Sequence, residues 1–180
     1  MPGVGRRLFG GALMRNEFFR LLVLAILVFA AALTANAKEV VGWVENAKVY
    51  PGGVQIKAKI DSGAKTSSLN CQCITPVKRN GKNWVSFTVK NYRGDIIRIE
   101  KPVYRIAKIK RHFGEQQERY VVKLGVCLGS VYREGDVTLV DRSGFNYQML
   151  IGRNFMKNDF LIDTGSTFVN KPSCKDAPEQ

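Results

Sequence analysis

One stretch, residues 54–69, constrains the fold of this chain more than any other part of it. Apolar residues alternate there with polar ones, at Val54, Ile56, Ala58 and Ile60. This period of two is typical of a strand with one buried face. The strand leads directly into Asp-Ser-Gly-Ala at residues 61–64, where glycine permits a tight turn and the close approach of another backbone. The sequence therefore predicts that Asp61 is presented at a strand end.

Short β-type runs separated by turn residues fill most of the chain after residue 39. Pro-Gly-Gly at 51–53 predicts a hairpin between residues 40–50 and the strand before Asp61, and Asn80-Gly81 predicts a second tight hairpin. We also expect residues 137–140 to pair with residues 145–151. The only helix that we expect after the N-terminal segment is a short one at 153–157. These patterns predict an all-β, barrel-like domain with one short C-terminal helix.

Residues 1–37 have the pattern of an export signal. An apolar run at 21–33 follows Arg15 and Arg20 and precedes the small residues Ala35 and Ala37. A positive region, a short apolar region and an Ala-x-Ala site are typical of a secretory signal peptide. We expect cleavage after Ala37 and a periplasmic domain at 38–180. An uncleaved membrane anchor is the alternative, although the run is shorter than the roughly 20 residues that span a bilayer.

The expected domain is strongly basic and contains all four cysteines. The 180-residue chain has a formal net charge of +13, and about +10 remains after residue 37. Such a charge favours anionic partners, although a solvated basic surface is an equal alternative. Export permits disulfides, and the sequence leaves three pairings open among Cys71, Cys73, Cys127 and Cys174.

The residue types that are missing exclude several classes of enzyme. The chain has one histidine, His112, and no His-Glu-x-x-His or Gly-x-x-x-x-Gly-Lys-Ser/Thr motif. Metallohydrolase and P-loop ATPase chemistry therefore lack their usual ligands, and we expect neither a metal nor another cofactor. A serine or cysteine nucleophile would need His112, which stands in a polar segment that we expect at the surface.

Among the common classes of hydrolytic chemistry, catalysis by carboxylate groups remains. Two facing aspartates can share one proton, so that one activates a water molecule and the other protonates a peptide carbonyl. A short chain can supply both carboxylates when two copies pair across a twofold axis.

At this point two motifs carry a family resemblance. Residues 58–69 (AKIDSGAKTSSL) and 151–155 (IGRNF), followed by FLID, resemble bacterial retropepsin-like proteins that are often labelled putative ATP-dependent zinc proteases. The resemblance implies a closed or partly open barrel, a catalytic Asp61 and an active-site loop of Ser62, Gly63 and Ala64. It also implies that Gly152, Arg153 and Asn154 support that loop from behind, and that the enzyme is a homodimer.

The chain departs from the viral retropepsin pattern in two ways. Lys65 stands where the viral enzymes have an aspartate that pairs with the arginine of Gly-Arg-Asn, so Arg153 lacks that partner. Lys65 instead suggests a substrate with an acidic side chain near the scissile bond, and a solvated turn residue is the equal alternative. Extra residues also separate the two motifs, so the flap is not defined; the turns at 91–95 and 80–81 are both candidates for its tip.

A second Asp-Thr-Gly occurs at residues 163–165. Asp163 could complete a dyad with Asp61 within one chain, as in two-lobed pepsin-like enzymes. Too few residues follow it to build a second lobe with its own flap. We therefore expect a structural role for Asp163, in bonding Arg153 or the terminal strands of the dimer, and keep it as the less favoured second carboxylate.

The sequence thus leads to a periplasmic, homodimeric aspartic endopeptidase that acts on a peptide or protein substrate. The alternative from another class is a noncatalytic module that binds anionic envelope components through its basic surface. We expect no nucleic-acid partner, because the aromatic residues are not interleaved with the basic ones in a stacking pattern. Membrane contact is expected only if the signal is not cleaved.

Overall fold

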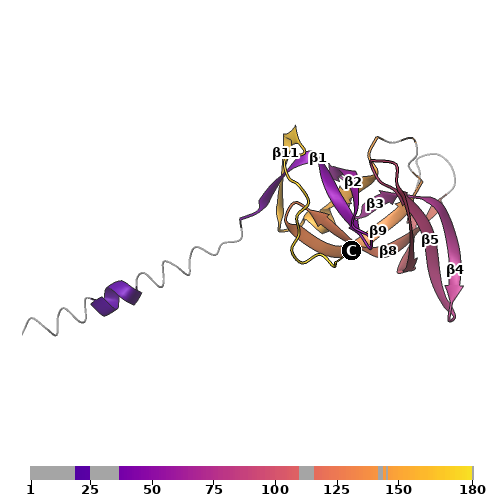
Figure 1. The fold of residues 1–180 in the computed structure, drawn as a ribbon, viewed down its shortest axis with the longest axis horizontal. Helices are drawn as coiled ribbons and strands as arrows, with labels where there is room; N and C mark the ends of the chain where they lie inside the picture. Colours follow the sequence, from indigo (N-terminus) through magenta and orange to yellow (C-terminus); the bar gives the residue numbers. More distant parts are fainter. Residues whose placement is uncertain (1–18, 25–36, 110–115, 142–143, 145, 180) are drawn as a thin grey trace, which may run out of the picture. The chain divides into compact units, whose positions relative to one another are not determined.

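Strands account for most of the chain after Lys38 (Figure 1). The computed structural model describes residues 19–24, 37–109, 116–141, 144 and 146–179. In chain order the elements of the domain are β1 (Glu39–Tyr50), β2 (Val54–Asp61), β3 (Ser67–Asn70), β4 (Gln72–Arg79), β5 (Lys82–Lys90), β6 (Ile96–Pro102), β7 (Arg105–Ile109), β8 (Gln117–Leu128), β9 (Val131–Val140), β10 (Met149–Gly152), α2 (Arg153–Met156) and β11 (Phe160–Thr167).

The N-terminal segment forms a unit separate from Lys38–Gln180. Residues 19–24 of this segment are helical. Apart from Ala37, the rest of the expected signal lies outside the described residues, as does His112. Within the part of the chain that is described, no helix is long and apolar enough to cross a membrane.

Six strands close into a barrel in the order β1, β2, β10, β3, β9 and β8. The ring closes where β8 pairs with β1 in antiparallel register, with Leu128 opposite Ala47 and Gly125 opposite Tyr50. In this closed sheet each of the six strands has a hydrogen-bonded neighbour on both sides. The all-β barrel with one short helix near its end is therefore confirmed.

Five further strands extend this barrel. β11 runs parallel to β1, and β7 pairs with β8, so these two strands form the ends of the eight-stranded sheet. β4, β5 and β6 form a separate antiparallel sheet, whose first hairpin projects from the barrel in Figure 1. The predicted hairpin at residues 80–81 is confirmed: Asn80 and Gly81 have φ angles of 48° and 73°, as a tight turn of this kind requires.

The apolar core fills the barrel and extends beneath the second sheet. The predicted alternation in β2 is confirmed, because its four apolar residues are buried and the residues between them are more exposed. Phe87 of β5 is fully buried in the same cluster as Leu124 and Ile151 of the barrel. The three-stranded sheet is therefore packed on the barrel through a shared core.

One predicted pairing is wrong. Residues 137–140 do not pair with residues 145–151, because β10 lies between β2 and β3, parallel to the first and antiparallel to the second. β9 pairs instead with β8 and β3. Hydrophobic alternation shows which face of a strand is buried, but it carries no information about the neighbouring strand.

Hydrogen bonds to β1 hold the segment that follows β11. The fully buried carboxylate of Glu45 accepts hydrogen bonds from the amides of Gly42 at 2.7 Å, Val169 at 3.0 Å and Asn170 at 3.3 Å. The Asn170 side chain also donates to the Val40 carbonyl at 2.5 Å. The first strand and the tail of the domain therefore lie side by side.

A disulfide between Cys127 and Cys174 fixes the tail further along. The bond joins residues 47 positions apart. It is compatible with only one of the three pairings that the sequence left open, and the second bond of that pairing, Cys71–Cys73, is not formed. Cys71 and Cys73 remain free, the first buried and the second exposed.

We expect Cys174→Ser to lower the free energy of unfolding by up to about 4 kcal/mol, because the unfolded chain regains the entropy of the closed loop. Urea unfolding under non-reducing conditions measures the change. Cys73→Ser is the matched control, since this thiol is exposed and free. Equal effects of the two substitutions would contradict the prediction.

Candidate active site

Asp61 ends β2 and is held by the turn that follows it. Its Oδ1 atom accepts hydrogen bonds from the amides of Gly63 at 2.9 Å and Ala64 at 3.2 Å. The Ala64 amide also approaches the Asp61 carbonyl at 3.3 Å. Oδ2 accepts no hydrogen bond from any other described residue, so one oxygen of the carboxylate is unused within the described chain.

Gly152 lies directly against this turn. It pairs with Asp61 across the parallel β2–β10 ladder, and its amide donates to the Ser67 hydroxyl at 3.1 Å. A Cβ at this position would lie 2.8 Å from the Thr66 carbonyl carbon and 3.0 Å from the Ala64 oxygen. Only glycine permits two backbones to approach this closely.

The first residues of α2 bind the next part of the loop. The Arg153 amide donates to the Ala64 carbonyl at 2.9 Å, and the Asn154 amide donates to the Lys65 carbonyl at 3.0 Å. The Arg153 guanidinium donates to the Ser62 carbonyl at 2.6 Å. The structure thus brings Gly152, Arg153 and Asn154 into contact with the loop that follows Asp61, as the family resemblance implied.

Lys65 is exposed and has no acidic partner among the described residues. Beside it lies a hollow of about 680 Å³, the basic hollow, which is lined by Ala64, Lys65, Arg105, Lys108 and Arg119 among others. Arg105 is 3.5 Å from Asp136, and Lys108 is 3.7 Å from Glu118. The hollow therefore combines one unpaired cation next to the loop with further cations whose charge is partly compensated.

β7 lines the basic hollow, and neither predicted flap tip does. Its lining includes residues 105–109 but no residue from 80–81 or 91–95. The turn at 80–81 ends the β4–β5 hairpin, and the turn at 91–95 joins β5 to β6 in the second sheet. β7, which lines this hollow together with Ala64 and Lys65, is therefore a strand that the sequence did not connect with a flap.

Asp163 is placed apart from the Asp61 loop. It pairs with Gly42 in the β1–β11 ladder, so β1 separates β11 from β2. Its Oδ2 atom accepts a hydrogen bond from the Ser166 hydroxyl at 2.6 Å, and its Oδ1 atom accepts one from the Gly165 amide at 2.9 Å. These two bonds, with that from Ser166 dominant, lower the pKa of the Asp163 carboxyl.

The suggested bond between Asp163 and Arg153 is wrong, because the Arg153 guanidinium binds the Ser62 carbonyl instead. The Asp163 carboxylate accepts hydrogen bonds only from nearby residues of β11, Gly165 and Ser166, among the described residues. The described part of one chain therefore supplies a single carboxylate, Asp61, at the loop that Gly152 and α2 support.

The cysteines next to this region are poorly suited to bind a metal. Burial raises the pKa of the Cys71 thiol to about 12, which disfavours the thiolate that a metal requires. Cys73 is exposed, so the two thiols of the Cys-x-Cys pair occupy different environments. In the described ranges, no group of three or more His, Cys, Asp or Glu side chains is placed to hold a metal ion.

Three residues of this architecture were missed from the sequence. Ser67 binds the Gly152 amide, Glu45 binds the tail, and Arg133 of β9 binds the end of α2 and the segment that follows it. A charged residue within the apolar strand 40–50 is a signal that could have singled out Glu45. Nothing in the local pattern around Arg133 identifies its contacts, because they depend on how distant segments pack.

A six-stranded barrel that carries an Asp-Ser-Gly loop, closed from behind by a Gly-Arg-Asn segment, defines a retropepsin-like protein. The sequence model of the RimB-like family, described as retropepsin-like aspartic endopeptidase RimB, matches residues 40–173. The chain belongs to this family, so the resemblance seen in the two motifs is confirmed.

Similar proteins add two findings. Probable alpha-L-glutamate ligases from Shewanella pealeana and Desulfotalea psychrophila are 41% and 34% identical over 116 and 131 residues, which is 63% and 71% of this chain but 25% and 28% of theirs. The chain thus spans about a quarter of the length of the curated relatives it matches. A crystal structure of a protein of unknown function from Legionella pneumophila subsp. pneumophila str. Philadelphia 1 is 30% identical, with a TM-score of 0.65, and the match covers 75% of this chain and all of that one.

We expect Gly152→Ala to destabilise the protein by about 1–3 kcal/mol, because the added methyl group overlaps the Thr66 and Ala64 backbone. Thermal or urea unfolding measures the loss. Gly135→Ala is the control, since a Cβ there would meet no atom within 4 Å. A Gly152→Ala protein as stable as this control would show that the close contact is not required.

Proposed function

We propose that this chain is an aspartic endopeptidase whose active form is a homodimer with one Asp61 from each copy. The observation that carries the proposal is the unused Oδ2 oxygen of Asp61, on a loop that Gly152 and α2 hold by backbone contacts and by the Arg153 side chain. Membership of the retropepsin-like family supports the same chemistry.

In the proposed reaction the two Asp61 carboxyls share one proton. The ionised carboxylate removes a proton from water as the water oxygen attacks the peptide carbonyl carbon, and the protonated one gives its proton to the carbonyl oxygen. The tetrahedral intermediate then collapses, the carbon–nitrogen bond breaks, and a proton passes to the leaving amine. No metal or cofactor takes part in these steps.

The need for a second copy follows from the single carboxylate in the described chain. Ser62 and Gly63 are exposed beside Asp61, so a twofold-related loop could approach them. β11 is an end strand of the eight-stranded sheet and leaves one edge unpaired. In the proposed dimer Ser62 braces the opposite loop across the axis.

The substrate that we propose is a peptide with acidic side chains near the cleaved bond. Lys65 lies beside Ala64 of the active-site loop, and the basic hollow provides further cations from β7 and β8. Relatives named as probable alpha-L-glutamate ligases point to glutamate as a chemically fitting side chain. We do not transfer their ligase activity, since this chain corresponds to a quarter of their length.

We also propose that the domain works in the periplasm after export by its N-terminal signal. The pattern of residues 1–37 carries this proposal. The Cys127–Cys174 disulfide supports it, because such bonds persist in oxidising compartments.

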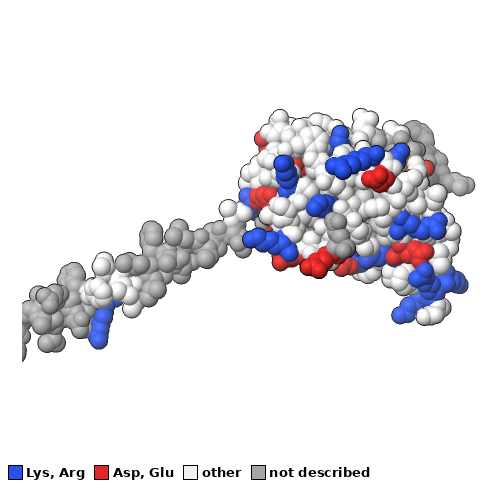
Figure 2. Space-filling model, viewed as in Figure 1, with Lys and Arg blue, Asp and Glu red and all other residues white. Residues whose placement is uncertain are grey.

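A noncatalytic module that binds anionic ligands is the second candidate. It is favoured by the projecting β4–β5 hairpin, where Lys78, Arg79 and Lys82 gather and Figure 2 shows blue side chains at the end of the hairpin. Glu100 is the acidic partner of Arg79 there. This function predicts salt-sensitive binding of an anionic polymer that is indifferent to Asp61→Asn.

We expect Asp61→Asn to lower peptide cleavage at least ~10²-fold, because the amide can neither share the proton nor activate water. Cleavage of a peptide library at several pH values, with and without a pepstatin-type inhibitor, measures the effect. Asp163→Asn is the control and should retain activity. Equal and complete loss in both variants would favour a dyad within one chain and overturn the dimer proposal.

We expect Lys65→Glu to reverse the preference for acidic substrates, because a like charge replaces the cation beside the loop. The ratio of kcat/KM for a glutamate-containing peptide to that for its glutamine analogue should fall by about tenfold, which corresponds to about 1.4 kcal/mol. Lys78→Glu, on the distant hairpin, is the charge-matched control. An unchanged ratio in the Lys65 variant would refute the acidic-substrate proposal.

A further inference from the structure

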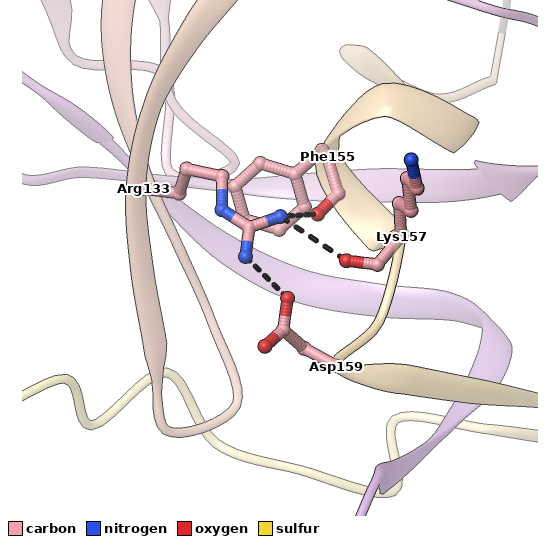
Figure 3. Close-up of polar contacts among 4 residues, drawn as sticks. All are labelled: Arg133, Phe155, Lys157 and Asp159. Atoms are coloured by element: carbon pink, nitrogen blue, oxygen red, sulfur yellow. Dashed lines mark hydrogen bonds and ion pairs between the residues drawn. The ribbon is translucent and has the colours of Figure 1, made fainter.

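The guanidinium of Arg133 contacts three residues of the short segment 155–159 (Figure 3). Nη1 donates to the Phe155 carbonyl at 2.5 Å and approaches the Lys157 carbonyl at 3.5 Å. Nη2 forms an ion pair with Asp159, and the guanidinium carbon lies 5.8 Å from the centre of the Phe155 ring. One side chain of β9 therefore fixes the end of α2 and the turn into β11.

The helix α2 cannot hold this position by itself. It spans only Arg153–Met156, and the Lys157 amide bonds the Arg153 carbonyl at 2.9 Å. So short a helix is marginal in isolation, and the carbonyl groups at its end need partners from outside the helix. Arg133 supplies a partner for the Phe155 carbonyl.

The same helix holds the active-site loop at its other end. Its first two amides bind the Ala64 and Lys65 carbonyls, and the Arg153 side chain binds the Ser62 carbonyl. Arg133 itself is carried by β9, which is hydrogen-bonded on both sides, to β3 and to β8. A continuous set of contacts therefore runs from a central barrel strand through α2 to the Asp61 loop.

We propose that Arg133 is a positioning residue: it fixes α2 against the barrel and thereby sets the place of the Asp61 carboxylate. This inference rests on the proposed peptidase function. Arginine suits the role because its planar fork can bind two carbonyls and a carboxylate at once, whereas a lysine ammonium offers a single point of charge. Displacement of a reacting group by about 1 Å can lower a rate by ~10²-fold.

The test compares Arg133→Met and Arg133→Lys with Arg79→Met. Arg79 is the matched control: it pairs with Glu100 and lies 5.3 Å from the Trp84 ring centre, but on the second sheet and away from the Asp61 loop. The first readout is the separate measurement of kcat and KM for peptide cleavage. The second is hydrogen exchange of the Arg153 and Asn154 amides, which bind the loop carbonyls.

We expect Arg133→Met to lower kcat by about 10- to 100-fold and to change KM by less than about threefold, since the Asp61 carboxylate moves while the cations that β7 and β8 contribute to the basic hollow stay in place. The two amides should exchange at least about tenfold faster, and barrel amides such as that of Leu124 should not. Arg133→Lys should lie between Arg133→Met and the wild type, and Arg79→Met should match the wild type.

Wild-type kcat and wild-type exchange in Arg133→Met would overturn the inference. A uniform rise in exchange across the barrel would also overturn it, because Arg133 would then contribute only to global stability. If the wild-type protein cleaves no peptide, the proposed function fails, and the local exchange of the two amides alone decides whether Arg133 positions the loop.

Discussion

The close contact between Gly152 and the Thr66 and Ala64 backbone is the constraint on which the site depends. It lets β10 insert between β2 and β3, so that the residues after the strand meet the loop after Asp61. A larger side chain would force these two backbones apart. The support of the carboxylate therefore combines main-chain contacts, which require glycine at position 152, with side-chain contacts from Ser67 and Arg153.

The sequence predicted what depends on local pattern and missed what depends on distant packing. Alternation identified the strand before Asp61, and the Asn80-Gly81 pair identified a hairpin, because each signal lies within a few residues. The neighbours of β10 could not be predicted, since alternation specifies a face and not a partner strand. For the same reason the pairing of the disulfide was left open and the contacts of Arg133 were missed: they join segments 47 and up to 26 positions apart.

The candidate site likewise contains residues that local pattern predicted and contacts that depend on distant packing. The two motifs together indicated the Asp61 loop and its support at Gly152, Arg153 and Asn154, and these residues do meet in the fold. Lys65 was recognised as a departure from the viral pattern, but the basic hollow beside it depends on β7, whose position no local signal specified. The new partner of Arg153, a carbonyl of the loop, shows how the fold accommodates the change at residue 65.

The fastening of the tail beside the first strand has a consequence for how such a domain can be used. Val40 and Asn170 are hydrogen-bonded to each other, so the path of the chain into the barrel and the path out of it start from one place. A domain of this kind can be joined to other polypeptides, or placed within one, without stretching or reordering its strands. The barrel is thus suited to fusion or insertion as one domain of a longer polypeptide.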